Sequence, residues 1–371
     1  MWIWIALLVF LIVSMLLGAL YLTVAFARFG VFRRVAGESL WKRRALSFGF
    51  LLLLFALLTF TMNMLNAVIV FLHLIAAFFL FGLLDAAVVR FRGKPFPFYA
   101  RGWCALAASA LYLAAGWYLC HHVWRTDYAL STDKPIERVR IALFADSHIG
   151  TTFDGDGMAR HLETIMARNP DVILIAGDFV DDGTARRDML RACEALGAVK
   201  PKYGVWFAYG NHDVGYFSNR DFTIGELTDA LEASGVRVLA DETAEIGPLY
   251  LAGRLDASRS PRKEISELLK DAPSDKYVVV IDHEPTDYEN ESRSPADLVL
   301  SGHTHGGQLF PINRAGEWFN LNDRTYGRER RGGAEFIVTS GISDWSVKFK
   351  TGTKSEYVII DVEPKKSGER F

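Results

Sequence analysis

The stretch Val139-Arg140-Ile141-Ala142-Leu143-Phe144-Ala145-Asp146-Ser147-His148 decides the fold, because an apolar strand runs directly into two metal-binding residue types. Four later apolar runs end in the same way, at Gly177-Asp178, Gly210-Asn211-His212-Asp213, His283 and Gly302-His303-Thr304-His305. In α/β folds, ligands gather at the carboxyl ends of strands that are distant in sequence. We therefore expect these five fragments to meet at one edge of a sheet.

The residue types in these fragments favour a site for divalent metals. Carboxylate oxygen, amide oxygen and neutral imidazole all suit hard or borderline cations. Asp146 and His148 are two positions apart at a strand end, so both side chains can point to the same side. Asp178 ends the next strand and is the natural bridge between two ions. Two bridged cations activate water for in-line attack on a phosphate group.

Read in order, the five fragments resemble the calcineurin-like metallophosphoesterases over residues 139–362, most specifically in Gly302-His303-Thr304-His305 and the following Gly306-Gly307-Gln308. The resemblance implies an αββα sandwich of mixed sheets and two divalent ions, with Mn, Fe and Zn all suitable. It implies that one ion is held by Asp146, His148, Asp178 and His305, and the other by Asp178, Asn211, His283 and His303. It also makes His212 the group that protonates or stabilises the leaving oxygen. We expect Asp213 to orient His212, and Asp181 to support the ligands from behind.

Two further fragments, Gly306-Gly307-Gln308-Leu309 and His283-Glu284-Pro285, resemble the YkuE/YaeI-like membrane-associated branch of this superfamily. Residues 343–348 follow that branch only loosely. Arg324 and Arg328, in a basic segment after the His-Thr-His loop, could bind a phosphate or an anionic head group, and a solvated loop is an equal alternative. The aromatic residues Trp318, Phe319, Tyr326 and Trp345 would form an apolar wall, enter the membrane interface or pack in the core.

The first third of the chain is a different kind of sequence, dominated by Leu, Phe, Ala, Val and Trp. A membrane span needs roughly 20 apolar residues, and four stretches qualify, at 2–26, 46–64, 67–89 and 103–123. The polar cluster at 61–66 predicts a tight turn between the second and third. We expect a transmembrane region at 1–124, a linker at 125–137, the catalytic domain at 138–363 and a tail at 364–371.

The distribution of Lys and Arg predicts the orientation in the cell membrane. Basic residues gather in the connections after the first and the third span, and the short second turn has none. These two basic connections are therefore expected in the cytoplasm. A chain with four spans then has its N-terminus and its catalytic domain outside the cytoplasm.

The composition narrows the function further. A net charge of −2 shows no basic excess that would predict a nucleic-acid partner, and three cysteines are too few for a disulfide framework. The sequence predicts a membrane-anchored phosphohydrolase whose partners are the lipid bilayer and a phosphorylated, lipid-linked or envelope substrate, in an oligomeric state that it does not specify. The alternatives are a UDP-2,3-diacylglucosamine pyrophosphatase, whose cytoplasmic substrate conflicts with the expected topology, a non-catalytic metal-binding receptor or scaffold, and a transporter with an appended domain.

Overall fold

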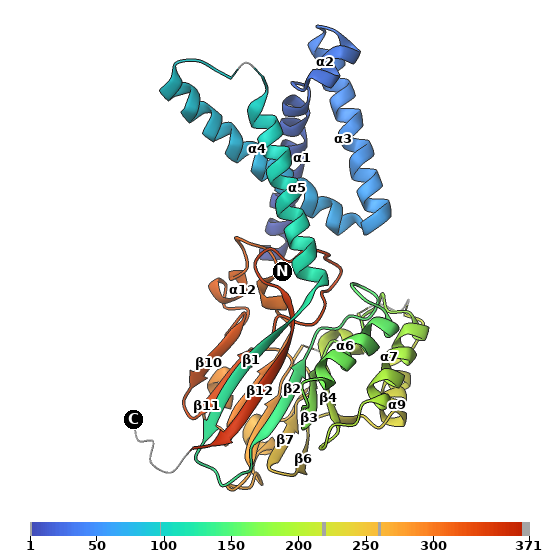
Figure 1. Ribbon diagram of the computed structural model, residues 1–371, viewed down its shortest axis with the longest axis vertical. Coiled ribbons are helices and arrows are strands. Elements are labelled where there is room, and N and C mark those ends of the chain that lie inside the picture. Colours follow the sequence, from blue (N-terminus) through green and yellow to red (C-terminus); the bar gives the residue numbers. More distant parts are fainter. Residues whose placement is uncertain (1, 97, 217–219, 259–260, 366–371) are drawn as a thin grey trace. The chain divides into compact units, whose positions relative to one another are not determined.

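The computed structural model describes residues 2–96, 98–216, 220–258 and 261–365, and it divides into two compact units (Figure 1). The first unit is Met1–Gly116 and the second is Trp117–Phe371. Each is described by itself below.

The first unit is helical. It contains α1 (Trp2–Phe26), α2 (Gly30–Ala36), α3 (Leu40–Met62), α4 (Met64–Arg92) and most of α5 (Ala100–His121). In the described part of the chain, α3, α4 and α5 are long and apolar enough to cross a membrane, and a fourth span results if the bent pair Val13–Phe26 and Gly30–Ala36 is counted as one. The break between α3 and α4 falls at Asn63, whose side chain accepts a hydrogen bond from Asn66 N at 2.9 Å. The break thus lies inside the turn expected at 61–66.

The second unit contains two six-stranded mixed sheets. In the first sheet the strand order is β1 (Val123–Thr132), β12 (Ser355–Pro364), β2 (Val139–Phe144), β3 (Val172–Ala176), β4 (Val205–Ala208) and β5 (Arg237–Leu239). In the second it is β10 (Gly327–Arg331), β11 (Ala334–Val338), β9 (Leu298–Ser301), β8 (Tyr277–Ile281), β7 (Leu249–Gly253) and β6 (Glu242–Ile246). Strands β2 to β5 run parallel, as do β7, β8, β9 and β11. The carboxyl ends of these parallel strands are therefore available to form one site.

The central strands of each sheet are buried on both faces, and the alternation of their side chains divides the core. In β2, Ile141 and Leu143 enter the core between the sheets, while Ala142 and Phe144 face the helices α6 (Gly155–Met166), α7 (Arg186–Ala198) and α9 (Ile224–Ala233). Figure 1 shows these three helices on the outer side of the first sheet. The short helices α10 (Ile265–Leu268) and α11 (Tyr288–Glu291) pack on the second sheet. The predicted αββα sandwich is confirmed.

The segment expected to be a linker is largely a strand. β1 pairs in parallel with β12 along its whole length, from Val123 opposite Ser355 to Thr132 opposite Pro364. The physical reason is a period-two pattern that the sequence reading passed over: Leu130 and Thr132 are buried, while Arg125 and Asp127 are exposed. The folded unit therefore begins before residue 138, and of the expected tail only residues 364 and 365 are described.

Candidate metal centre

All seven expected metal ligands lie at the carboxyl edge of the two sheets. Asp146 and His148 follow β2, Asp178 follows β3, Asn211 begins the short helix α8 (Asn211–Val214) after β4, His283 follows β8, and His303 and His305 follow β9. Six of them form two groups, Asp146 with His148 and His305, and Asp178 with His283 and His303. Within each group the candidate ligand atoms lie within 4.8 Å of one another. The fold thus brings together what the sequence scatters over five fragments.

Asp178 lies between the two groups. Its Oδ2 is 3.1 Å from His283 Nε2 and 3.7 Å from His148 Nε2, so one carboxylate oxygen faces an imidazole of each group. The seventh residue, Asn211, has its Oδ1 2.9 Å from His303 Nδ1. Asp178 thus belongs to the second group and also faces His148 of the first group.

The main chain at these ligands is strained. Asp146, His148, Asp178, His303 and His305 all have positive φ angles, between 36° and 69°. Non-glycine residues rarely adopt this left-handed region, and such residues cluster at functional sites. The glycines beside them allow close approach: a Cβ at Gly210 would lie 2.3 Å from Asp178 Oδ1, and one at Gly302 would lie 2.7 Å from Asp146 Oδ2.

Asp213 holds the loops together. We expected it to orient His212, but within the described residues no hydrogen bond joins its carboxylate to the His212 ring. Its Oδ2 accepts hydrogen bonds from the main-chain N–H groups of Asp178 and Gly210, both at 2.8 Å. Its Oδ1 accepts two more, from Phe179 at 2.8 Å and Val180 at 3.1 Å. Both oxygens are occupied because the loops after β3 and β4 turn their N–H groups inward. Asp213 therefore fixes the backbone that carries Asp178 and Asn211.

His212 lies beside the ligands without belonging to either group. Its main-chain N–H donates to Asp178 Oδ1 at 2.8 Å, and its ring centroid is 5.1 Å from that of His148. The rings of Tyr216 and Trp345 lie 5.0 and 5.2 Å away. Burial lowers the pKa of His212 to about 4, with Asp178 opposing the shift, so the ring is neutral near pH 7. Within the described residues its Nδ1 has no hydrogen-bond partner.

Polar groups behind the ligands fix the imidazole rings. His283 Nδ1 is 2.7 Å from the carbonyl oxygen of Ala176, and His148 Nδ1 is 3.5 Å from Asp181 Oδ2, as the sequence reading expected for Asp181. Contacts of this kind set the tautomer, so that Nε2 remains free for a metal.

The sequence reading missed Asp344, whose Oδ1 is 3.2 Å from His305 Nδ1. Asp344 is fully buried and also accepts hydrogen bonds from Gln308 Nε2 and from its neighbour's main-chain N–H. The loop that carries it is held by the buried Lys350, whose ammonium donates to the carbonyl oxygens of Ser340 and Ser343. In the sequence, Asp344 is only one acidic residue in the segment 343–348, and this segment resembles the membrane-associated branch only loosely.

The donor set fits two divalent cations. The Nε2 atom of His148 is buried without a hydrogen-bond partner among the described residues, which is rare for polar atoms unless an ion or water binds them. Burial lowers the pKa of His303 to about 4, and burial together with His148 lowers that of His305 far below its usual value. These two rings are thus neutral near pH 7, which is the form that binds metals. The surrounding carboxylates raise the pKa values of His148 and His283, and binding of a cation would release those protons.

Arg324 and Arg328, the expected substrate contacts, have other partners. Arg328, on the edge strand β10, forms two hydrogen bonds with Glu335 at 2.8 and 2.9 Å. Arg324 contacts Glu329 at 3.2 Å and donates to the carbonyl oxygen of Tyr326 at 2.9 Å. Paired guanidinium groups have little left to offer a phosphate. The structure gives no contact between either arginine and the seven ligands within the described residues.

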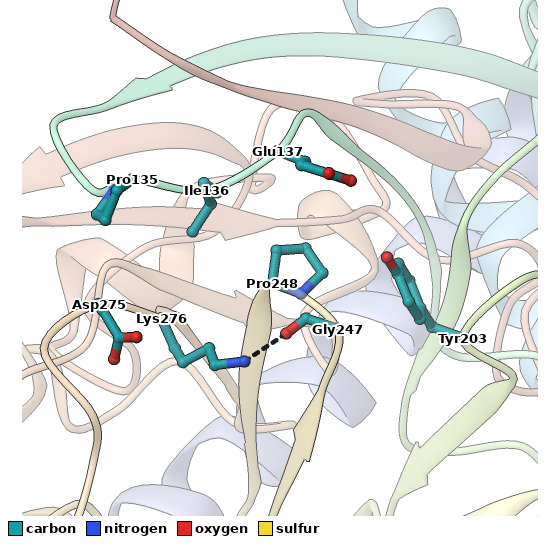
Figure 2. Close-up of a pocket in the computed structure, with 8 residues that line it drawn as sticks. All are labelled: Pro135, Ile136, Glu137, Tyr203, Gly247, Pro248, Asp275 and Lys276. Carbon is teal, nitrogen blue, oxygen red and sulfur yellow. Dashed lines mark hydrogen bonds between the residues drawn. The ribbon is translucent and has the colours of Figure 1, made fainter.

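A pocket, drawn in Figure 2, lies where β2, β4, β7 and β8 begin. It is therefore at the edge of the sheets opposite to the metal centre. It is lined by Pro135, Ile136, Glu137, Tyr203, Gly247, Pro248, Asp275 and Lys276. The Lys276 ammonium donates to the carbonyl oxygen of Gly247 at 2.7 Å and pairs with Glu245 at 2.8 Å. It contains none of the expected ligands.

Comparisons with known proteins agree with this geometry. A family model described as calcineurin-like phosphoesterase matches residues 139–307. An uncharacterised metallophosphoesterase of Campylobacter jejuni is 25% identical over 241 residues, which are 62% of this chain and 60% of the relative. A transmembrane protein with metallophosphoesterase domain from Danio rerio is 29% identical over 235 residues, 60% of this chain and 52% of the relative. The match thus spans little more than half the length of these relatives.

Among solved structures, a dimetal phosphatase from Danio rerio aligns with 55% of this chain and 87% of its own, at 12% identity and a TM-score of 0.36. The family match begins at the first residue of β2 and ends just after His305, and so includes all seven residues of the metal centre. Residues 139–307 of this chain are therefore a calcineurin-like phosphoesterase domain.

Proposed function

We propose that this protein is a membrane-anchored phosphohydrolase that cleaves a phosphoester or pyrophosphate bond with metal-activated water. The observation that carries the proposal is the position of Asp178 between two groups of ligands, with His148 on one side and His283 on the other. Two divalent ions bound there would lower the pKa of a shared water and neutralise phosphate oxygens. Asp146, His148 and His305 would hold one ion, and His283, His303 and Asn211 the other.

His212 would act on the leaving group. Its neutral ring carries one N–H, which can donate a hydrogen bond to a phosphoryl or leaving oxygen. The hydrogen bond from its main-chain N–H to Asp178 Oδ1 keeps it close to the bridging carboxylate. Asp213 would contribute through the backbone by fixing the loops that carry Asp178 and Asn211.

The apolar helices support a membrane location, and a lipid-linked or envelope substrate follows from it. An enzyme held at a bilayer meets substrates that are held there too, at a raised effective concentration. The basic connections favour a catalytic domain outside the cytoplasm. A reporter fused after Phe371 tests this topology, and a cytoplasmic signal would favour the UDP-2,3-diacylglucosamine pyrophosphatase reaction instead.

The hydrolysis test uses the full-length protein, stripped of metal and reloaded with Mn, Zn or Fe. Bis(p-nitrophenyl) phosphate and p-nitrophenyl phosphate serve as diester and monoester probes. We expect metal-dependent release that falls more than about 100-fold in Asp178→Asn, because loss of a bridging ligand should exceed the 10–100-fold typical of residues behind the ligands. Asp229→Asn, an exposed carboxylate on α9, is the matched control and should retain full activity.

Equal turnover in Asp178→Asn and the control would refute the two-metal mechanism. Stoichiometric metal binding without hydrolysis of either probe would favour the receptor or scaffold alternative.

A further inference from the structure

Large apolar side chains are exposed in only a few places on the sandwich. Within the described residues between 122 and 365, seven are exposed: Tyr216, Phe310, Ile312, Trp318, Phe319, Leu321 and Trp345. Tyr216 and Trp345 flank His212. The other five lie within twelve consecutive positions, directly after the ligand loop of His303 and His305. We call these five the 310–321 patch.

The exposure of the patch is extensive. Phe319 is 66% exposed, Trp318 is 62% exposed, and Phe310, Ile312 and Leu321 are each between 57% and 59% exposed. Scattered single apolar residues are normal on a protein surface, whereas a contiguous group marks a contact with another molecule or a membrane.

The backbone beneath the patch is nonetheless well fixed. The short helix α12 (Ala315–Trp318) is tied down by Glu317, whose Oε1 accepts a hydrogen bond from Thr325 N at 2.9 Å. A Cβ at Gly307 would lie 1.7 Å from the carbonyl oxygen of Asn313. The segment around Asn313 therefore packs directly on the ligand loop, which contains Gly307. The apolar side chains are therefore held outward by an ordered segment.

The patch is also electrically neutral. Its segment contains one cation and one anion, Arg314 and Glu317, and they pair with each other. An acidic or basic partner would find no complementary charge here. An apolar environment is the better complement.

Contacts connect this segment to the end of α5, a candidate membrane span. Thr351 N donates to the carbonyl oxygen of Gln308 at 2.9 Å, and Phe310 N donates to Thr351 Oγ1 at 3.1 Å. Two residues earlier, the ring of Phe349 lies 6.0 Å from that of Trp117 in the last turns of α5. Trp117 and Tyr118 are exposed as well, and such aromatic residues favour the boundary between lipid and water.

We propose that the 310–321 patch is a membrane-contacting surface, which sits in the lipid interface beside the end of α5 and keeps the metal centre at the bilayer. This inference rests on the proposed membrane anchoring. Its occupant is the bilayer itself, because the patch is apolar, neutral and continuous with a helix of membrane-spanning composition. A substrate phosphate borne on a lipid would then reach the ligand loop without leaving the interface.

The test measures the depth of spin labels in the full-length protein in phosphatidylcholine nanodiscs. The exposed Cys104 is first changed by Cys104→Ser, and single labels are then placed by Phe319→Cys or Ile312→Cys. Leu53→Cys, 69% exposed on α3, is the lipid control, and Asp229→Cys on α9 is the water control. Relaxation by oxygen, which concentrates in lipid, is compared with relaxation by a water-soluble nickel chelate.

For labels at residues 319 and 312 we expect relaxation by oxygen to exceed relaxation by the nickel chelate, as for the lipid control at residue 53. The water control at residue 229 should show the opposite order. Adding phosphatidylglycerol should not change these values, because the patch is neutral. Labels at 319 and 312 that behave like residue 229 would overturn the inference. So would labels shielded from both reagents, which would indicate a second protein copy, or a depth that appears only with anionic lipid.

Two readouts on the same samples separate this inference from the proposed function. If Leu53 is in lipid and bis(p-nitrophenyl) phosphate is hydrolysed while residue 319 is in water, only the patch inference fails. If residue 319 is in lipid and no hydrolysis occurs, the proposed reaction fails and the membrane contact stands. If Leu53 is itself in water, the anchoring and the inference fail together.

Discussion

Two clusters of buried charge lie next to each other in this molecule, and they are neutralised in different ways. At the end of β8, Asp282 and His283 are neighbours in sequence and belong to different clusters. Asp282 contacts Arg254 at 2.9 Å and Arg262 at 2.8 Å, whereas His283 contacts Asp178 at 3.1 Å. The first cluster contains its own cations, and the second is built from carboxylates, imidazoles and an amide.

The arginine cluster is satisfied from within the chain. Arg254, 2% exposed, forms ion pairs with Asp282, Asp287 and Glu291 at 2.8 to 3.2 Å. In the metal centre, by contrast, the buried Nε2 atom of His148 has no hydrogen-bond partner within the described residues. The comparison teaches that buried acidic residues by themselves do not identify a metal site. The distinguishing feature is a set of ligand atoms that face one another and, within the described residues, form no ion pair with a lysine or an arginine.

The largest stability effect is expected in the arginine cluster. Arg254→Met should lower the free energy of unfolding by about 3–5 kcal/mol, because it leaves buried carboxylates without a counter-charge. Chemical denaturation of the metal-loaded protein measures this loss, and metal analysis should still find both ions in the folded fraction.

A neutralised variant sharpens that prediction. The triple change Arg254→Met, Asp282→Asn and Glu291→Gln removes the charges together and should be less destabilising than Arg254→Met alone. A triple variant at least as unstable as the single one would show that the cluster acts through packing and not through charge.

A smaller effect is expected behind the metal ligands. Asp344→Asn should weaken metal binding by about 10–100-fold, because it removes the carboxylate that faces His305 Nδ1. Competition with a chelator measures the affinity directly and does not require turnover. Asp229→Asn is again the control, and an unchanged affinity in Asp344→Asn would mean that the loop alone orients His305.

The last effect concerns His161, a partly buried ionisable group that has no acidic partner among the described residues. Burial lowers the pKa of His161 to about 4, and its ring packs 4.6 Å from that of Phe153. Above about pH 6.5 the folded and unfolded states are both neutral at this residue, so it has no effect. As the pH falls from about 6.5 toward 4, the unfolded state binds a proton that the folded state does not, and stability decreases by up to about 3 kcal/mol.

His161→Leu should reduce this part of the pH dependence, which is measured by chemical denaturation between pH 4 and pH 7. A slope identical to that of the unchanged protein would show that His161 titrates normally.

The sequence predicted the sandwich and the gathering of the ligands because that information is local. A strand that ends in Asp-Ser-His or Gly-Asp marks its own carboxyl end, and parallel strands bring such ends together.

The contact of Asp344 with His305 could not be predicted in this way, because it depends on the path of a loop fixed by Lys350. Asp213 carried a misleading signal: its place after His212 suggested an orienting partner, whereas its oxygens bind the main chain. The strand β1 leaves only a short alternating pattern in the sequence, with Leu130 and Thr132 on the buried face.

The adjacency of Asp282 and His283 restricts which insertions and deletions this gene can tolerate. Successive residues of a strand point to opposite faces, so a shift of one position exchanges their surroundings. Loss of a single residue in β8 would place the His283 imidazole opposite Arg254 and the Glu284 carboxylate opposite Asp178. Gain of a residue would place Ile281 opposite Arg254 and the Asp282 carboxylate opposite Asp178. The arginine cluster would then lose an ion pair, and the metal centre would lose a histidine ligand. The length of this strand is therefore fixed by two independent requirements, and length changes in descendants of this gene should accumulate in the surface loops and not in β8.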